Sequence, residues 1–156
     1  MEQMQKAHIA LINKQIKELV GVYRDAAREL NMPESEFWVW YTLVAIPGDF
    51  TQQDICAMWS LPKQTVNTAI AHMRLRRFAY LEAVPHTRNR KIIRLTPEGR
   101  KFGERLVHPI SQAEKRAFAR IDPETLQMVT QVFGTYIDII REEMLDRTEG
   151  SGAVCG

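Results

Sequence analysis

Cysteines, long apolar runs and secretion signals are scarce or missing in this sequence of 156 residues. The two cysteines, Cys56 and Cys155, lie far apart and match no metal-binding or disulfide framework, so we expect a reducing, cytoplasmic location. Either thiol could still respond to oxidants. No apolar run approaches the roughly 20 residues needed to span a bilayer, and residues 1–6 are polar, unlike a secretory signal. These absences argue against a membrane-spanning or secreted protein.

Motifs that carry catalysis are missing as well. The sequence contains no glycine-rich phosphate loop, no nucleophile elbow and no paired-histidine motif. His8, His72 and His108 show no spacing to other histidines, cysteines or acids that suits a metal ion. We therefore expect a protein that is not an enzyme and has no cofactor and no metal site.

Positive charge is concentrated in one stretch of the chain. Residues 61–105 contain eleven Lys and Arg and three Glu, a net charge of +8. The remainder contains ten basic and sixteen acidic residues, a net charge of −6. A basic segment between acidic ends is typical of a polyanion-binding surface, although a solvated charged surface explains the composition equally well.

Two short helical segments follow one another in the middle of the sequence. Thr51 and Asp54 resemble a helix-capping pair, and a short helix is expected from there to about Met58. Residues 59–61 form a tight break, and Pro62 begins a second helix with one apolar face. Two helices joined by three or four residues are typical of a helix-turn-helix motif.

A β-hairpin is predicted directly after this motif. Residues 80–84 and 91–95 can form strands, and the polar residues 85–90 between them make a basic turn, or wing. Thr96 followed by Pro97 is a strong helix start. The sequence thus predicts a mainly α fold with a small β-hairpin wing, a winged helix-turn-helix DNA-binding domain plus a helical dimerisation region.

Long stretches with apolar side chains at helical spacing lie on both sides of this domain. They are too long to bury those side chains on so small a core, so we expect them to form a dimer interface. The expected organisation is a single domain at 1–149, with the winged helix-turn-helix at about 33–100, dimerisation helices at about 1–30 and 101–147, and a flexible tail at 150–156.

The residues expected to contact DNA come from two places. A recognition helix reads bases from its first turns, because Gln and Asn can bind adenine bidentately and Lys can bind guanine. A hairpin can insert Arg88 into the minor groove, while Arg90 and Lys91 meet phosphates, and Arg94 is expected to hold the DNA backbone as Lys91 does. The candidates are Lys63, Gln64, Thr65, Asn67 and Thr68 in the recognition helix, and His86, Arg88, Arg90 and Lys91 in the wing. The other interpretation is a solvated helix face and hairpin.

Aromatic residues are dense in the helix predicted at residues 34–46. Trp38 and Tyr41 could line a pocket for a small molecule, since such pockets combine aromatic walls with a few polar groups. The alternative is that both rings belong to the core, where aromatic side chains contribute large buried areas.

Two segments together resemble the MarR (multiple antibiotic resistance regulator) family. Residues 61–70, Leu-Pro-Lys-Gln-Thr-Val-Asn-Thr-Ala-Ile, are similar to its recognition helix, and residues 88–99 to its wing running into a Leu-Thr-x-x-Gly turn. The resemblance covers nearly the whole chain. It implies a homodimer that binds a pseudo-palindromic operator in double-stranded DNA, usually as a repressor, and is often released by a small aromatic or anionic effector. The family often has an acid where this chain has His86, so Arg88 needs another support.

Three functions are compatible with these observations. The first is a DNA-binding transcription regulator, and the second is its narrower version, a small-molecule-responsive sensor of drugs or stress. The third is a protein-interaction module that uses a winged helix without DNA. The basic wing favours the first two, because a protein-binding winged helix has no need of one.

Overall fold

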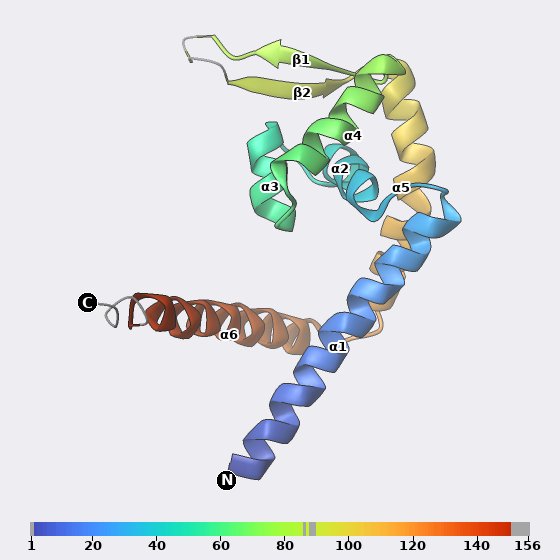
Figure 1. The fold of residues 1–156 in the computed structure, drawn as a ribbon. Helices are drawn as coiled ribbons and strands as arrows, with labels where there is room; N and C mark the ends of the chain where they lie inside the picture. Colours follow the sequence, from blue (N-terminus) through green and yellow to red (C-terminus); the bar gives the residue numbers. More distant parts are fainter. Residues whose placement is uncertain (1, 86, 88–89, 151–156) are drawn as a thin grey trace, which may run out of the picture. The chain divides into compact units, whose positions relative to one another are not determined.

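The computed structural model describes residues 2–85, 87 and 90–150. These residues form six α-helices and one two-stranded antiparallel hairpin (Figure 1). The elements are α1 Glu2–Glu29, α2 Glu34–Ala45, α3 Gln52–Trp59, α4 Lys63–Leu75, β1 Ala79–Ala83, β2 Lys91–Leu95, α5 Pro97–Phe118 and α6 Pro123–Gly150. The chain divides into two compact units between Gln112 and Ala113, and each is described by itself.

The fold class predicted from the sequence is confirmed, and the differences lie at the ends of elements. Pro62 was expected to begin its helix but occupies the N-cap position, with a ψ angle of 138°, and Pro33 occupies the N-cap of α2 in the same way, with a ψ angle of 142°. An N-cap residue has extended backbone, which proline's fixed φ allows. Helix α6 continues to Gly150, where the sequence predicts a flexible tail, and residues 151–156 of that tail lie outside the described residues.

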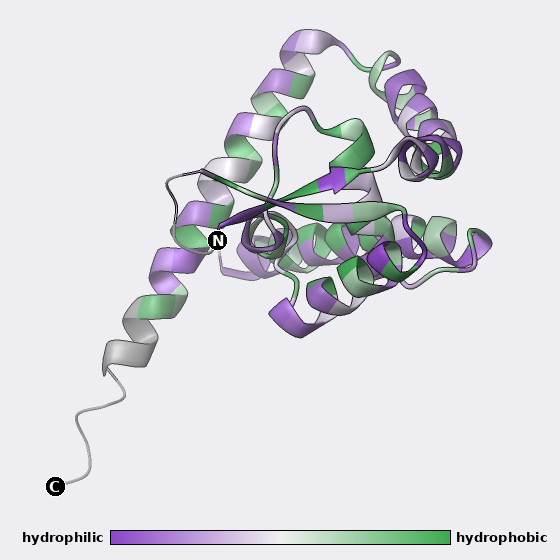
Figure 2. Cartoon of the chain, turned by 90° about the horizontal axis from the view of Figure 1, so that it is seen from above, coloured by the Kyte–Doolittle hydropathy of each residue, from purple (hydrophilic) through white to green (hydrophobic). Residues whose placement is uncertain are grey.

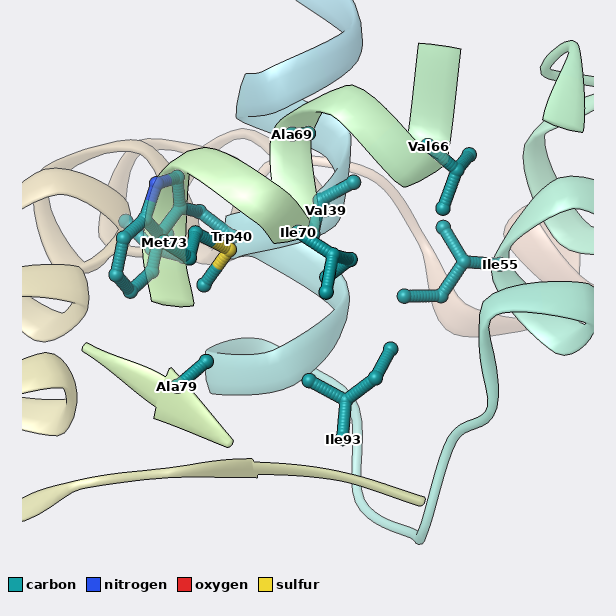
Figure 3. Close-up of a cluster of buried hydrophobic side chains, with 10 residues drawn as sticks. Val39, Trp40, Ile55, Val66, Ala69, Ile70, Met73, Ala79 and Ile93 are labelled. Atoms are coloured by element: carbon teal, nitrogen blue, oxygen red, sulfur yellow. The ribbon is translucent and has the colours of Figure 1, made fainter. Parts of the chain in front are cut away.

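One hydrophobic core holds the helix-turn-helix and the base of the hairpin together (Figure 3). The apolar positions of α4 recur every three or four residues, so they form one face that packs on α2 and α3. The hairpin adds one buried side chain from each strand. The cluster consists of Val39, Trp40, Ile55, Val66, Ala69, Ile70, Met73, Ala79, Ile93 and Val107.

A single corner joins α4, the hairpin and α5. The Thr96 hydroxyl donates to the Arg77 carbonyl at 2.9 Å and accepts from the Gly99 N–H at 3.0 Å, so it caps α5 as the sequence predicts. The Thr96 N–H donates to the Phe78 carbonyl at 3.0 Å. A Cβ atom on residue 99 would lie 1.9 Å from that same carbonyl oxygen. Helix α5 therefore packs this closely only because residue 99 is glycine.

Helices α1 and α6 carry apolar side chains among hydrophilic ones along their length (Figure 2). The exposed large ones include Met4, Ile9, Leu11, Leu19 and Val22 in α1, and Met128, Val129, Val132, Phe133 and Ile139 in α6. Apolar faces of this extent usually mark protein interfaces. In the described part of the chain, no helix combines the length and hydropathy required to cross a bilayer.

Replacing Gly99 with alanine should lower the free energy of unfolding by about 1–3 kcal/mol, because the added Cβ overlaps backbone that cannot easily move. Gly21 in α1 is the matched control, since a Cβ there meets no atom within 4 Å. Gly21→Ala should be neutral or stabilising. Urea unfolding at a fixed protein concentration measures both changes. Wild-type stability of Gly99→Ala would contradict the close approach of α5.

Candidate nucleic-acid interface

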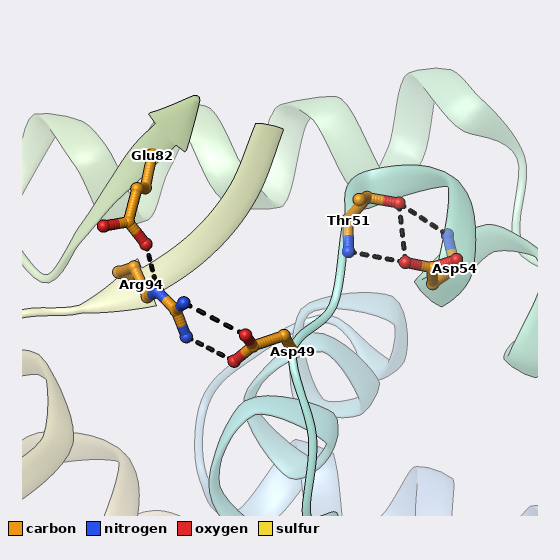
Figure 4. A network of polar contacts seen from close by, with 5 residues as sticks. All are labelled: Asp49, Thr51, Asp54, Glu82 and Arg94. Atoms are coloured by element: carbon orange, nitrogen blue, oxygen red, sulfur yellow. Dashed lines mark hydrogen bonds and ion pairs between the residues drawn. The ribbon is translucent and has the colours of Figure 1, made fainter. Parts of the chain in front are cut away.

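Helix α3, the first helix of the helix-turn-helix motif, begins with a closed capping box (Figure 4). Thr51 Oγ1 accepts a hydrogen bond from the Asp54 N–H at 3.2 Å, and the Asp54 carboxylate accepts one from the Thr51 N–H at 2.8 Å. The backbone hydrogen bond from Thr51, followed by that from its hydroxyl, holds the pKa of Asp54 below its ordinary value. The predicted capping pair is confirmed, and it fixes where α3 starts.

A tight turn then sets the direction of α4, the predicted recognition helix. Ser60 has a φ angle of 51°, in the left-handed region, and ends α3. Pro62 follows at the N-cap of α4. Because Val66 and Ile70 are buried against α2 and α3, the opposite face of α4 is left to solvent.

The predicted contact residues of α4 differ in accessibility. Lys63, Gln64 and Thr68 are exposed, while Thr65 and Asn67 are half-buried. The Oδ1 atom of Asn67 is fully buried and has no hydrogen-bond partner among the described residues. Bidentate binding of adenine uses both the oxygen and the nitrogen of an amide. Gln64 therefore has the accessibility that such binding needs, whereas the Asn67 side chain would have to rotate to expose its oxygen.

A groove with a volume of about 690 Å³ brings three segments together. Its lining consists of Thr51, Gln52, Gln53 and Asp54 at the start of α3, Lys63 at the start of α4, and Leu81, Arg90 and Lys91 from the hairpin segment. The three cations outnumber the single carboxylate, and the N-terminus of α3 adds the positive end of a helix dipole. This arrangement suits the phosphate backbone of a nucleic acid.

The groove includes residues that sequence reasoning proposed and others that it missed. Lys63, Arg90 and Lys91 were predicted from recognition-helix and wing patterns, and the structure places them around one space. Gln52 and Gln53 were missed, although the capping pattern beside them marks a helix start that exposes backbone N–H groups.

The tip of the wing lies partly outside the described residues. This applies to His86 and Arg88, while Arg90 and Lys91 next to them are exposed. Cys56 is half-buried in α3, and Cys155 is outside the described part. Within the described ranges, no group of three His, Cys, Asp or Glu side chains could hold a metal ion.

Arg94 in β2 was expected to meet phosphate, but its guanidinium binds two carboxylates of the protein itself (Figure 4). Its Nε donates to the Glu82 carboxylate at 2.6 Å, its Nη2 donates to Asp49 Oδ2 at 3.0 Å, and its Nη1 donates to Asp49 Oδ1. The hydrogen bonds from Asp49, and then from Glu82, raise the pKa of Arg94 above its ordinary value. The pairing with Asp49 could not be found in the sequence, because 45 positions separate the two residues.

Two further cations of the basic segment lie over aromatic rings. The Arg76 guanidinium is 4.7 Å from the centre of the Phe78 ring and 4.9 Å from that of Phe102, and Arg105 is 5.8 Å from the latter. Such contacts are favourable cation–π interactions. The composition gives every cation of the segment the same weight. In the fold, however, Arg76 and Arg105 contact aromatic rings and Arg94 contacts carboxylates of the same domain.

The aromatic residues of α2 form a cluster with their neighbours. The Trp38 ring stacks on Trp59 of α3 with ring centres 4.1 Å apart, and lies 4.8 Å from Tyr23 and 5.6 Å from Tyr41. The Trp59 indole N–H donates to the hydroxyl of buried Thr42 at 2.7 Å. Trp38 and Tyr41 nevertheless stay half-buried, so the predicted pocket at these residues remains a prediction.

Comparisons with solved structures agree on the fold. A MarR family regulator from Neisseria meningitidis matches with a TM-score of 0.79 at 19% identity, over 90% of this chain and 98% of that one. MepR from Staphylococcus aureus in a DNA-binding conformation gives 0.68 at 15% identity, over 85% and 98%. MarR from the same organism, in complex with salicylate and kanamycin, gives 0.63 at 14% identity, over 91% and 95%. No protein-family profile and no curated protein sequence matches the chain.

The class of fold follows from these matches. The chain has the winged helix-turn-helix fold of MarR family transcriptional regulators, and the resemblance noted in its recognition helix and wing agrees with the similarity of the whole fold. These structural neighbours are described as transcriptional regulators.

Removing the Asp54 carboxylate should destabilise the domain in a pH-dependent way. At neutral pH, Asp54→Asn should lower the free energy of unfolding by about 0.5–2 kcal/mol, the range for a lost helix cap. The folded-state pKa of Asp54 is lowered, so its contribution is present above an unfolded pKa of about 3.9. It is lost as the pH falls through the folded pKa. Urea unfolding across this range should show the wild type and variant converging in acid, and a gap that is constant with pH would contradict the capping role.

Proposed function

We propose that the chain is a member of the MarR family, a non-enzymatic regulator that binds specific sites in double-stranded DNA and represses transcription. The observation that carries the proposal is the groove in which Lys63, Arg90 and Lys91 meet the N-terminus of α3, beside the exposed Gln64. MepR from Staphylococcus aureus, solved in a DNA-binding conformation, has a similar fold, and this similarity supports the proposal. The cytoplasm is the location expected from the sequence, and the proposal keeps it.

Recognition would divide between the two elements. Helix α4 enters the major groove, where Gln64 and Lys63 reach base edges and Thr68 lies one turn further along the same face. The wing lies over the adjacent backbone, and Arg90 and Lys91 contact phosphates. Each phosphate neutralised releases condensed counterions, so affinity should fall steeply with salt.

A homodimer fits the apolar faces of the long helices. The exposed apolar side chains of α1 and α6 have no partner surface large enough within a small winged-helix core, and a second copy supplies one. A two-fold dimer places two α4 helices about 34 Å apart, which matches one turn of DNA and a pseudo-palindromic operator.

A small aromatic or anionic effector would act through the cluster around Trp38 and Tyr41. The cluster links α1, α2 and α3, so a ligand bound there touches both a dimerisation helix and the helix-turn-helix. MarR from Staphylococcus aureus, whose structure contains salicylate, supports the class of effector, a small aromatic anion. The test is to titrate phenolic acids while measuring tryptophan fluorescence, and then to measure whether the same compounds release bound DNA. If fluorescence and DNA binding are both unchanged, the rings serve only as core.

Mutations should separate base reading from backbone holding. Gln64→Ala should weaken binding to the preferred duplex by about 1–3 kcal/mol and leave binding to random duplex nearly unchanged. Lys91→Ala should weaken both duplexes alike and make the salt slope shallower by about 0.9. Fluorescence anisotropy with salt titration measures each value. Unchanged sequence preference in Gln64→Ala would show that another face reads the bases.

The dimer has a direct test in solution. One chain has a mass of 18.0 kDa, and light scattering at micromolar concentration should report twice that value. Val132, which is 63% exposed on α6, is a suitable position for a charge, and Val132→Glu should shift the mass toward that of one chain. A wild-type protein that scatters as a single chain would contradict the dimer.

A further inference from the structure

Arg94 occupies an unusual position for a cation in a DNA-binding segment. It lies in β2, on the outward face of the hairpin, where its strand partner is Tyr80. The opposite face of the hairpin packs into the core through Ala79 and Ile93. All three guanidinium nitrogens that can donate are directed to carboxylates, to Glu82 on the neighbouring strand and to Asp49 in the segment before α3.

We infer that Arg94 is a positioning residue, which fixes the wing relative to α3 and α4 through Asp49 and Glu82 and does not itself bind phosphate. The inference rests on the proposed DNA-binding function and names a group that this function requires. The three residues are called the Arg94 network below.

The contacts around Arg94 show what the network holds. Two strands of five residues are marginal by themselves, so the hairpin depends on its attachment to the domain. The segment before α3 runs beside β2, where the Ile93 N–H donates to the Phe50 carbonyl at 2.9 Å and Thr51 bridges to Ile92. Arg94 adds a bidentate contact to Asp49 at the same junction. The N–H groups of a guanidinium point in fixed directions within one plane, so Arg94 fixes the positions of both carboxylates relative to each other. A lysine ammonium group would not do so.

The charges argue against a phosphate contact by the same residue. Side chains in the network are between one third and about half exposed, so water can reach them. Three of the five N–H donors of Arg94 already bind carboxylates, so a phosphate could meet only the two that remain, and it would do so beside two negative groups. The network as a whole has one positive and two negative groups, so its local effect on DNA is weakly repulsive.

Two hypotheses therefore predict opposite signs for one substitution. Asp49→Asn removes a negative charge from a DNA-binding domain, so charge alone predicts tighter binding. Loss of the network predicts weaker binding, by roughly threefold to tenfold, because the wing must then be ordered by DNA. Glu98→Gln is the matched control, since Glu98 is an exposed acid of the same basic segment with no hydrogen bond or ion pair in the described part of the chain. It should bind as the wild type does or slightly more tightly.

Substitutions of Arg94 supply the second discrimination. If Arg94 bound phosphate, Arg94→Ala would make the salt slope shallower by about 0.9, and Arg94→Lys would restore it. If Arg94 positions the wing, both variants lose affinity with an unchanged slope, because lysine cannot pair bidentately with Asp49 and reach Glu82 at once. Asp49→Glu, which keeps the carboxylate, should recover much of the affinity that Asp49→Asn loses.

The experiment measures anisotropy on a duplex that the wild type selects from random DNA, with a salt titration for each variant. Hydrogen exchange at the Ile93 amide is followed in the free protein, where Asp49→Asn and Arg94→Ala should both accelerate it. Binding by Asp49→Asn as tight as the wild type, or a slope restored by Arg94→Lys, overturns the inference. If the wild type selects no duplex, the proposed DNA-binding function is wrong. In that case hydrogen exchange still tests the network, because unchanged exchange at Ile93 in Asp49→Asn and Arg94→Ala would overturn it.

Discussion

The Phe78 carbonyl is the point on which the arrangement of this domain depends. This carbonyl oxygen accepts a hydrogen bond from the Thr96 N–H. Helix α5 approaches it so closely that residue 99 has no room for a side chain. Arg77, whose φ angle of 58° turns the chain out of α4, accepts the Thr96 hydroxyl at the same corner. The recognition helix, the wing and the helix that leaves the domain are thus fixed by one set of backbone contacts, and a shift at this corner changes all three.

Electrostatics in this domain depends on which cations the fold has already engaged. Arg94 lies between two carboxylates, so its charge is already compensated, whereas the Arg76 guanidinium packs over two rings without an ion pair to a carboxylate among the described residues. Lys63, Arg90 and Lys91 instead surround an open groove next to the N-terminus of α3. The net charge of +8 in this segment therefore overstates the number of phosphate contacts. It describes how the protein is attracted toward DNA, and it does not identify the residues that make contact.

Local patterns were sufficient to predict the elements but not the contacts between them. The capping pair at Thr51 and the Thr96–Pro97 start appear in the sequence because the hydrogen bonds of a helix start join residues three apart. The Arg94–Asp49 pair joins distant segments, and the burial of the Asn67 oxygen depends on neighbours that periodicity does not identify. Recognition-helix candidates could be named in advance, whereas their accessibility, and the groove formed with Gln52, required the fold.

Hydroxyl-radical footprinting on a duplex selected from random DNA tests the central claim most directly, because it locates the protein along the double helix. The account predicts two protected regions related by a two-fold axis, with centres about one helical turn apart, and further protection where the wings lie. Substitution at Gln64 should change the selected sequence without moving the protected regions. A single protected region, or protection that shows no sequence preference, would contradict a dimer that reads DNA with paired α4 helices.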